Sequence, residues 1–345
     1  TTVIVTGINK YKDFNFFDKK KEEIVKPETK VKKEVKKPEI KVKKEVKKPE
    51  IKVKKEVKKP ETKVKKEVKK PEIKVKKNNV AEIILPDLNL KTETVIQLFK
   101  DVDYDLRKVR NEKLVKPIYF TQFPRDLDNL QSVQLKKETF IKIVLPLIVA
   151  ENAKITDDRE KLKLLNGKKY TTDSEKQWLR QKLLEYKVKK GDLDELMLRM
   201  DIIPVSIALA QAAKESGWGT SRFALEGNAI FGQWTWTGQG IEPLNKGKNQ
   251  DHKILRFPIL RASVKAYKNN LNTHKGYADF REKRENLRKR KKNIKGLDLT
   301  NTLHKYAQTG KEYTDKLEQI IRQNDLDDFE TVQLTNSVIK KELNL

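Results

Sequence analysis

From residue 136 onward, apolar residues recur mostly at the spacing of one face of a helix. The segment KKETFIKIVLPLIVAENAKI, residues 136–155, has the strongest pattern and predicts a buried helix. An alanine-rich stretch between Pro204 and Gly217 predicts another, because proline suits the start of a helix and glycine its end. Shorter patterns predict further helices over residues 157–166, 174–187, 192–200, 261–274, 279–292, 298–307 and 311–323.

Residues 229–260 have a different pattern. Four glycines and several aromatic residues occur here, and the stretch HKILRF at 252–257 is typical of a strand. This segment predicts a small β-lobe between helices. The predicted fold class is therefore α+β, and mostly α.

The N-terminal part of the chain contains a repeat. Prolines recur every 11 residues at Pro27, Pro38, Pro49, Pro60 and Pro71, and each full unit resembles KVKKEVKKPEI. Proline at this interval breaks helices, and residues 26–77 contain 24 lysines and 9 glutamates with little apolar surface. We expect a disordered linker, either a plain spacer or an arm that binds polyanions.

These patterns divide the chain into four parts. The predicted parts are a disordered basic segment (1–78), a partly structured lead-in (79–135), a main domain (136–330) and a C-terminal tail (331–345).

Composition narrows the classes of function. Lysine and arginine total 78 against 50 acidic residues, a formal net charge of +28, so anionic partners are favoured. No aromatic residues are interleaved with the lysines of the repeat and glutamate recurs in every unit, which argues against a nucleic-acid-binding protein. The absence of cysteine excludes disulfides and thiolate metal sites, and the three histidines lie far apart. No apolar run approaches the roughly 20 residues that cross a bilayer.

The stretch ALAQAAKESGWGT, residues 208–220, contains the main candidate for chemistry. Gln211 and Glu215 are four residues apart and share a helix face. Taken alone, Glu215 fits an ordinary surface glutamate. The last turn of a helix, however, disfavours a negative charge by about 0.3–1 kcal/mol. Burial against the aromatic side chains that follow would raise its pKa further, as a glycosidase acid requires. The nearest aromatic residues in sequence are Trp218, Phe223, Phe231, Trp234 and Trp236.

The stretch AQAAKESGWGTSRFALEGNAIFGQW resembles the signature of bacterial glucosaminidase domains, glycoside hydrolase family 73, and more closely the Bax-type proteins of Gram-negative bacteria. The resemblance continues through KPIYFTQFPRDL, MDIIPVSIALAQ, SVKAYKNNLNTHKGYADFR and YAQTGKEYTDKLEQIIRQN, and covers about residues 116–324. The lysine-rich repeat lies outside it.

The resemblance implies a lysozyme-like domain that cleaves the β-1,4 bond after N-acetylglucosamine in peptidoglycan. Glu215 matches the catalytic acid of the family, and Tyr306 in YAQTG matches a motif tyrosine near the cleavage point. Asn228 and Phe231-Gly232 match the motif that leads into the β-lobe, while Gln233-Trp234 replace a lysine-containing continuation. The predicted substrate-binding residues are Gln211, Trp218, Asn228, Phe231, Gln233 and Trp234.

A second carboxylate is less clearly marked. We favour Asp251 over Glu242, because GIEP at 240–243 is typical of a structural turn, and Glu226 is a third candidate. Either a lobe carboxylate activates water or the acetamido group of the substrate attacks. The alternatives are a lytic transglycosylase and a non-catalytic wall-binding scaffold.

The resemblance and the charge also predict the setting of the protein. We expect a monomer without cofactor or metal, with peptidoglycan glycan strands as partner and no nucleic acid. The lysine-rich segment would contact anionic envelope surfaces. The expected location is the periplasm or cell envelope of a Gram-negative bacterium, reached by secretion or by an anchoring segment absent from this chain.

Overall fold

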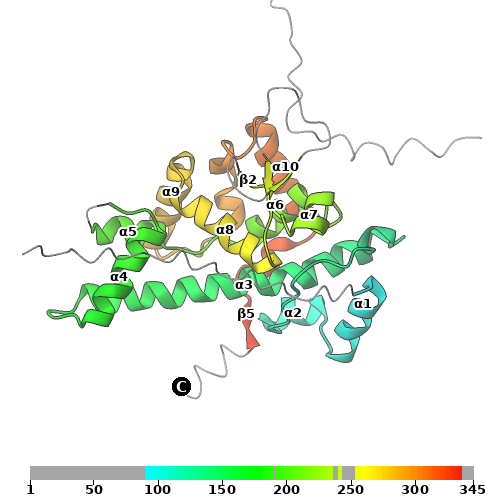
Figure 1. Ribbon diagram of the computed structural model, residues 1–345, viewed down its shortest axis with the longest axis horizontal. Coiled ribbons are helices and arrows are strands. Elements are labelled where there is room, and N and C mark those ends of the chain that lie inside the picture. Colours follow the sequence, from blue (N-terminus) through cyan, green and yellow to red (C-terminus); the bar gives the residue numbers. More distant parts are fainter. Residues whose placement is uncertain (1–89, 190, 236–239, 243–252, 336–345) are drawn as a thin grey trace, which may run out of the picture. The chain divides into compact units, whose positions relative to one another are not determined.

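The computed structural model describes residues 90–189, 191–235, 240–242 and 253–335 (Figure 1). The predicted disordered basic segment at 1–78, with its linker at 26–77, lies outside the described residues. Helices predominate and the strands are short, which confirms the prediction of a mostly α fold with a small β component. The α-helices are α1 (Thr92–Asp101), α2 (Leu106–Glu112), α3 (Val133–Asn166), α4 (Asp173–Glu185), α5 (Leu193–Arg199), α6 (Val205–Ser216), α7 (Arg222–Gly227), α8 (Leu260–Thr273), α9 (Ala278–Lys289) and α10 (Lys311–Gln323).

Helix α3 is one helix of 34 residues, so the predicted break between residues 155 and 157 was wrong. It continues through Pro146, which has no backbone N–H and therefore leaves the carbonyl of Lys142 without its helical partner. The Tyr104 hydroxyl donates a hydrogen bond of 3.1 Å to that carbonyl. The connection between α1 and α2 therefore supplies the hydrogen bond that the proline removes.

Helix α6 is almost wholly enclosed. Ten of its twelve residues are buried, and α3, α10 and the 3₁₀ turn η6 (Leu326–Phe329) all contact it (Figure 1). Its four alanines, Ala208, Ala210, Ala212 and Ala213, are at most 1% exposed. Their small side chains let neighbouring helices approach closely from several sides, which explains the alanine-rich sequence.

A carboxylate closes the N-terminus of α6. Glu330 Oε2 accepts a hydrogen bond of 2.9 Å from the Val205 N–H, and Oε1 accepts bonds from the Ser206 hydroxyl and the Gly296 N–H. The negative group lies at the positive end of the helix dipole. A Cβ at Gly296 would lie 2.0 Å from Ser206 Oγ, so this close backbone approach requires glycine.

A second ionic contact holds the segment that enters α6. Asp201 is 1% exposed and accepts hydrogen bonds from Arg288, while the fully buried Arg284 donates to the Ile202 carbonyl at 2.7 Å and to Asn272 Oδ1 at 2.9 Å. These bonds join α9 and α8 to the chain immediately before α6. Buried guanidinium groups require such partners, because an unpaired one would be strongly destabilising.

The strands form two small sheets. In the first, β1 (Leu114–Val115) pairs in parallel with β5 (Gln333–Leu334), so the lead-in contacts residues beyond 330. In the second, the antiparallel order is β2 (Trp234–Thr235), β4 (Lys253–Leu255), β3 (Gly240–Ile241). Strand β4 confirms the strand predicted within residues 252–257.

The predicted α-helix at 298–307 was wrong. The chain there forms the 3₁₀ turns η4 (Gly296–Asp298) and η5 (Thr300–Leu303). The hydroxyls of Thr300 and Thr302 donate to the carbonyls of Leu297 and Leu299, at 3.2 and 2.6 Å. Such side-chain bonds to nearby carbonyls compete with the α-helical pattern. The remaining 3₁₀ turns are η2 (Leu127–Asn129) and η3 (Lys275–Tyr277).

None of the helices in the described part of the chain combines the length and apolarity that a membrane span would need.

The contact between Glu330 and α6 predicts a large effect on stability. Glu330→Ala would leave the Val205 and Gly296 N–H groups without their acceptor, and we expect the free energy of unfolding to fall by about 2–4 kcal/mol. Asp327→Ala, an exposed change in the same turn, is the matched control and should change it little. Denaturant unfolding measures both, and equal effects would contradict the assigned role of Glu330.

Candidate active site

The end of α6 sets the position of Glu215. Gly217 is the C-cap in the left-handed conformation, with φ of 59°, as the sequence predicted. Trp218 and Gly219 also have positive φ, so the chain turns sharply away. The Ser216 hydroxyl accepts a hydrogen bond of 2.9 Å from the Gly219 N–H. Glu215 therefore lies at a closed turn held by its own hydrogen bonds.

A chain of hydrogen bonds orients the Glu215 carboxyl. The Tyr313 hydroxyl donates to Glu215 Oε1 at 2.9 Å and accepts from Gln211 Nε2 at 2.9 Å. Gln211 Oε1 in turn accepts from the Tyr267 hydroxyl at 2.7 Å. Gln211, Tyr267 and Tyr313 are at most 1% exposed. Side chains from α6, α8 and α10 thus form one continuous network that ends at the carboxyl.

Further tyrosines surround this network. The Tyr306 ring stacks on Tyr313, with centroids 5.5 Å apart, and its hydroxyl donates to the Phe231 carbonyl at 3.1 Å. The Phe231 ring stacks on Tyr267 at 3.8 Å, and Tyr277 lies 6.1 Å from Tyr306. Aromatic rings from the C-terminal part of the chain therefore enclose the carboxyl on several sides.

Gly232 lies beside the second carboxyl oxygen. Its φ is +58°, and a Cβ built there would lie 3.8 Å from Glu215 Oε2. The absence of a side chain leaves space next to that oxygen, and Glu215 itself is partly exposed. The carboxyl is therefore held through Oε1 and approachable at Oε2.

Burial raises the pKa of Glu215 to about 7. The hydrogen bond from Tyr313 and the positive charge of Lys214 both act in the opposite direction. The rise therefore comes from loss of water around the carboxyl. At neutral pH the group is poised between its acid and its anion, as a general acid needs to be.

Two of the predicted site residues join Glu215. Tyr306 is part of the tyrosine surround, and Gln211 is part of the hydrogen-bond network. Gln211 was predicted to bind substrate, but it is 0% exposed and both of its amide atoms bond to tyrosines. It therefore positions Tyr313 from within the core.

Three other predicted substrate residues have internal partners. The Phe231 ring is 2% exposed in its stack with Tyr267. Asn228 is the C-cap of α7, and its Nδ2 donates to the Phe257 carbonyl at 3.1 Å. The Trp218 ring contacts Phe140 of α3 in an edge-to-face arrangement, with Lys137 Nζ 4.9 Å from its centroid.

The β-lobe aromatic residues have a different role from the one expected. Phe223 and Trp234 pack against a small cluster formed by Ala229, Ile254 and Phe257. Gln233 is partly buried, and its Oε1 has no hydrogen-bond partner within the described ranges. Trp236 lies outside the described residues. Of the aromatic residues near Glu215 in sequence, Trp218, Phe223 and Trp234 thus pack elsewhere, while Phe231 stacks on Tyr267 beside the network.

Tyr267, Tyr277 and Tyr313 had no role predicted from the sequence. Tyr313 follows Tyr306 by seven residues in a stretch that the resemblance covered, which was the available signal. Its bond to Glu215 spans 98 residues, and that of Tyr267 to Gln211 spans 56. No periodicity along the chain reports such contacts.

Of the candidates for a second carboxylate, the structure describes Glu242 and Glu226. Asp251, the favoured one, lies outside the described residues. Glu242 forms an ion pair of 3.1 Å with Lys253, and the exposed Glu226 pairs with Arg222 at 3.3 Å. In residues 90–335, apart from the stretches that the structure leaves undescribed, no group of three or more histidine or acidic side chains could hold a metal ion.

Comparisons with known proteins bear on this site. The family model for glucosaminidase, described as mannosyl-glycoprotein endo-beta-N-acetylglucosaminidase, matches residues 190–326. The chain is also 33% identical to Protein bax of Escherichia coli (strain K12) over 205 residues, which cover 58% of this chain and 73% of that protein. The chain belongs to the Bax-type family of glucosaminidase-domain proteins. No solved structure matches it.

Membership of the Bax-type family makes this chain a glycosidase-type protein. The matched range includes Glu215 together with Gln211, Tyr267, Tyr306 and Tyr313, so the whole network lies inside the glucosaminidase domain. The lysine-rich repeat lies outside this range.

The raised pKa of Glu215 predicts a pH-dependent stability difference. Burying the carboxyl carries no charge cost below its ordinary pKa of 4.5; the cost grows as pH rises from 4.5 to about 7 and is constant at higher pH. Glu215→Gln removes that cost and keeps an acceptor for Tyr313. We expect the variant to unfold with about 2–3 kcal/mol more free energy than wild type at pH 8, and with equal free energy at pH 4. Glu226→Gln is the exposed control and should match wild type at both pH values. A difference that does not change with pH would contradict burial as the cause.

Proposed function

We propose that this chain is a peptidoglycan hydrolase that cleaves the β-1,4 glycosidic bond after N-acetylglucosamine, with Glu215 as general acid. The observation that carries the proposal is a partly exposed carboxyl whose pKa burial raises to about 7, inside the matched glucosaminidase domain. A glycosidase needs a carboxyl that is still protonated near neutral pH, because the leaving oxygen must receive a proton.

The hydrogen bonds assign separate roles to the two carboxyl oxygens. Oε1 accepts the hydrogen bond from Tyr313, so the acidic proton resides on Oε2. Oε2 faces the space beside Gly232, where the glycosidic oxygen would approach. Burial keeps the pKa of Tyr313 well above its ordinary value, so its hydroxyl remains a donor throughout the cycle.

Tyr306 supports this acid. Its hydroxyl is bonded to the Phe231 carbonyl, which fixes the ring beside Tyr313. The ring helps to keep water from the carboxyl and presents a partly exposed aromatic face near the cleavage point. Its removal should therefore weaken catalysis less than loss of the proton donor.

After bond cleavage the sugar cation must be captured. Either a carboxylate of the β-lobe, with Asp251 as our first choice, activates water, or the acetamido group of the substrate attacks. A lytic transglycosylase is the runner-up activity, since it also needs one acidic group. We propose the periplasm or cell envelope as the location, with glycan strands as the partner.

Mass spectrometry of the products from purified peptidoglycan tests the reaction. Cleavage after N-acetylglucosamine gives fragments with a reducing N-acetylglucosamine end, which we expect. Fragments ending in anhydro-muramic acid would instead identify a transglycosylase. Intact strands after prolonged incubation would indicate a scaffold without activity.

Substitution tests the roles of the residues. Glu215→Gln keeps the shape of the protonated acid but delivers no proton, so kcat should fall by at least 10²–10⁴-fold, roughly, with binding retained. Wild-type kcat/KM should fall as pH rises through about 7, when the acid ionises. Tyr306→Phe should lose less activity than Glu215→Gln. Asp251→Asn should lose nearly as much activity as Glu215→Gln if a carboxylate of the β-lobe acts as the base. It should lose little activity if the acetamido group of the substrate attacks. Activity of Glu215→Gln within tenfold of wild type would refute the assignment of the acid.

A further inference from the structure

The end of α3 combines positive charge with exposed apolar side chains. The stretch KLKLLNGKKY, residues 161–170, contains four lysines and no acidic residue. Of the exposed large apolar side chains in the described ranges, the three most exposed are Leu164 at 71%, Tyr170 at 80% and Leu184 at 80%. All three lie in the hairpin formed by α3, the loop at 167–172 and α4. We call residues 161–170 the α3 tip.

The α3 tip is built on a separate small core. Leu162 is fully buried with Tyr186 and Leu196, and Trp178 packs against this cluster. Thr172 forms a capping box at the start of α4, which fixes the loop. The backbone of the tip is therefore held without any contribution from Leu164 or Tyr170.

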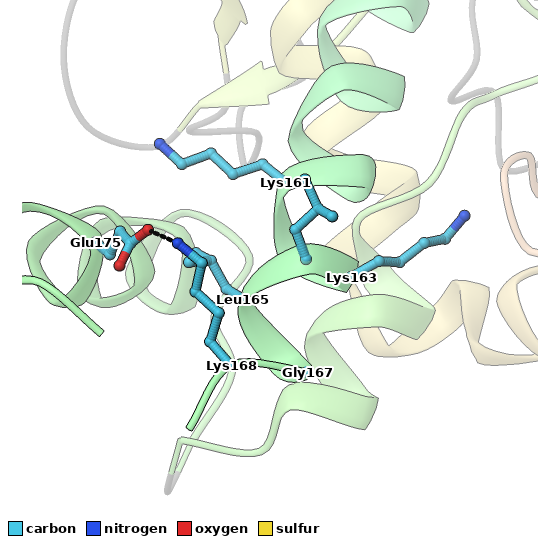
Figure 2. A pocket seen from close by; sticks show the side chains of 7 residues that line it. Lys161, Lys163, Leu165, Gly167, Lys168 and Glu175 are labelled. Atoms are coloured by element: carbon cyan, nitrogen blue, oxygen red, sulfur yellow. Dashed lines mark hydrogen bonds and ion pairs between the residues drawn. The ribbon is translucent and has the colours of Figure 1, made fainter. Parts of the chain in front are cut away.

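A hollow of about 490 Å³ opens at the tip (Figure 2). Leucines 164 and 165 and Gly167 contribute to its wall, and Figure 2 shows Lys161 and Lys163 extending to opposite sides. Lys168 pairs with Glu175 at 2.7 Å, and Lys163 pairs with Glu160 at 2.8 Å between groups that are more than half exposed. An exposed pair such as Lys163–Glu160 contributes little stability, so Lys163 is available to another anion.

We propose that the α3 tip docks on the surface of a bilayer that contains anionic phospholipids. Leu164 and Tyr170 enter the interfacial region, while Lys161, Lys163 and Lys169 contact phosphate groups. Lysines near an anionic membrane surface are attracted to it, and exposed apolar residues gain by leaving water there. A soluble polyanion would satisfy the lysines but would leave the apolar side chains in water, so the combination favours a bilayer.

This surface is independent of the Glu215 network. None of the tip residues belongs to that network, and the proposal holds whether or not the chain cleaves peptidoglycan. It also differs from binding through the lysine-rich repeat, since residues 26–77 offer charge without aromatic residues. The experiment must therefore report on the tip itself, in the full chain.

The chain has no cysteine, so one engineered cysteine can be labelled uniquely. Tyr170→Cys carries the environment-sensitive dye nitrobenzoxadiazole at the tip. Val133→Cys, at the other end of α3 and 65% exposed, is the matched control. Each labelled full-length chain is mixed with vesicles of phosphatidylcholine, with vesicles of equimolar phosphatidylcholine and phosphatidylglycerol, and with soluble polyphosphate. Vesicle sedimentation is measured in parallel.

We expect a blue shift and brighter emission at position 170 with the anionic vesicles alone, and no change at position 133. Leu164→Ser combined with Lys169→Gln should lower the vesicle partition coefficient several-fold and leave cleavage of soluble glycan fragments unchanged. Sedimentation without a shift at position 170 would assign binding to the N-terminal segment and overturn the proposal. An equal shift with polyphosphate, or no sedimentation at all, would also overturn it.

Discussion

The enclosure of α6 is the constraint on which the rest of the described structure depends. A helix buried on nearly all sides needs small side chains for its neighbours and partners for both of its ends. Its alanines meet the first need. At the N-terminus, Glu330 and the glycine at 296 supply acceptor and space, and the ion pairs of Asp201 hold the chain that enters the helix. The C-terminal end of α6 carries Glu215, the candidate catalytic residue.

The two ends of α6 each meet a carboxylate, and burial raises the pKa of both, but their hydrogen bonds differ. Glu330 lies at the positive end of the helix and accepts three hydrogen bonds, so it stabilises the fold. Glu215 lies at the negative end, accepts one bond from Tyr313 and loses water to the surrounding rings. Burial therefore destabilises the Glu215 anion. The fold loses some stability at high pH, and the carboxyl stays partly protonated near neutral pH. Functional sites commonly contain groups whose pKa is shifted at such a cost.

The tyrosine network holds the Glu215 side chain in one orientation, as the proposed general acid requires. Tyr267, Gln211 and Tyr313 are buried and bonded in series, so each holds the next in one orientation. Helix α6 provides Gln211, α8 provides Tyr267 and α10 provides Tyr313. The orientation of the carboxyl therefore depends on how these three helices pack. The α3 tip is built differently: its exposed side chains rest on a separate small core and are bonded only weakly.

Local patterns in the sequence determined a good part of this protein. Helical periodicity predicted most helices, Gly217 predicted the end of α6, and the motif around Glu215 indicated the family. These features depend on residues close together in the chain. The predicted break between residues 155 and 157 was wrong, and no local pattern showed that the hydroxyl replacing the bond missing at Pro146 comes from Tyr104, 38 residues from the carbonyl it serves.

Only the tertiary structure decided what surrounds Glu215. Trp218 packs on α3, and Phe223 and Trp234 pack in the β-lobe, while Tyr267, Tyr306 and Tyr313 arrive from helices and turns far along the chain. Burial, and with it the pKa of the acid, is a sum over all elements that pack around one carboxyl. No single stretch of sequence contains that sum, because loss of water at a point in space depends on which distant segments meet there.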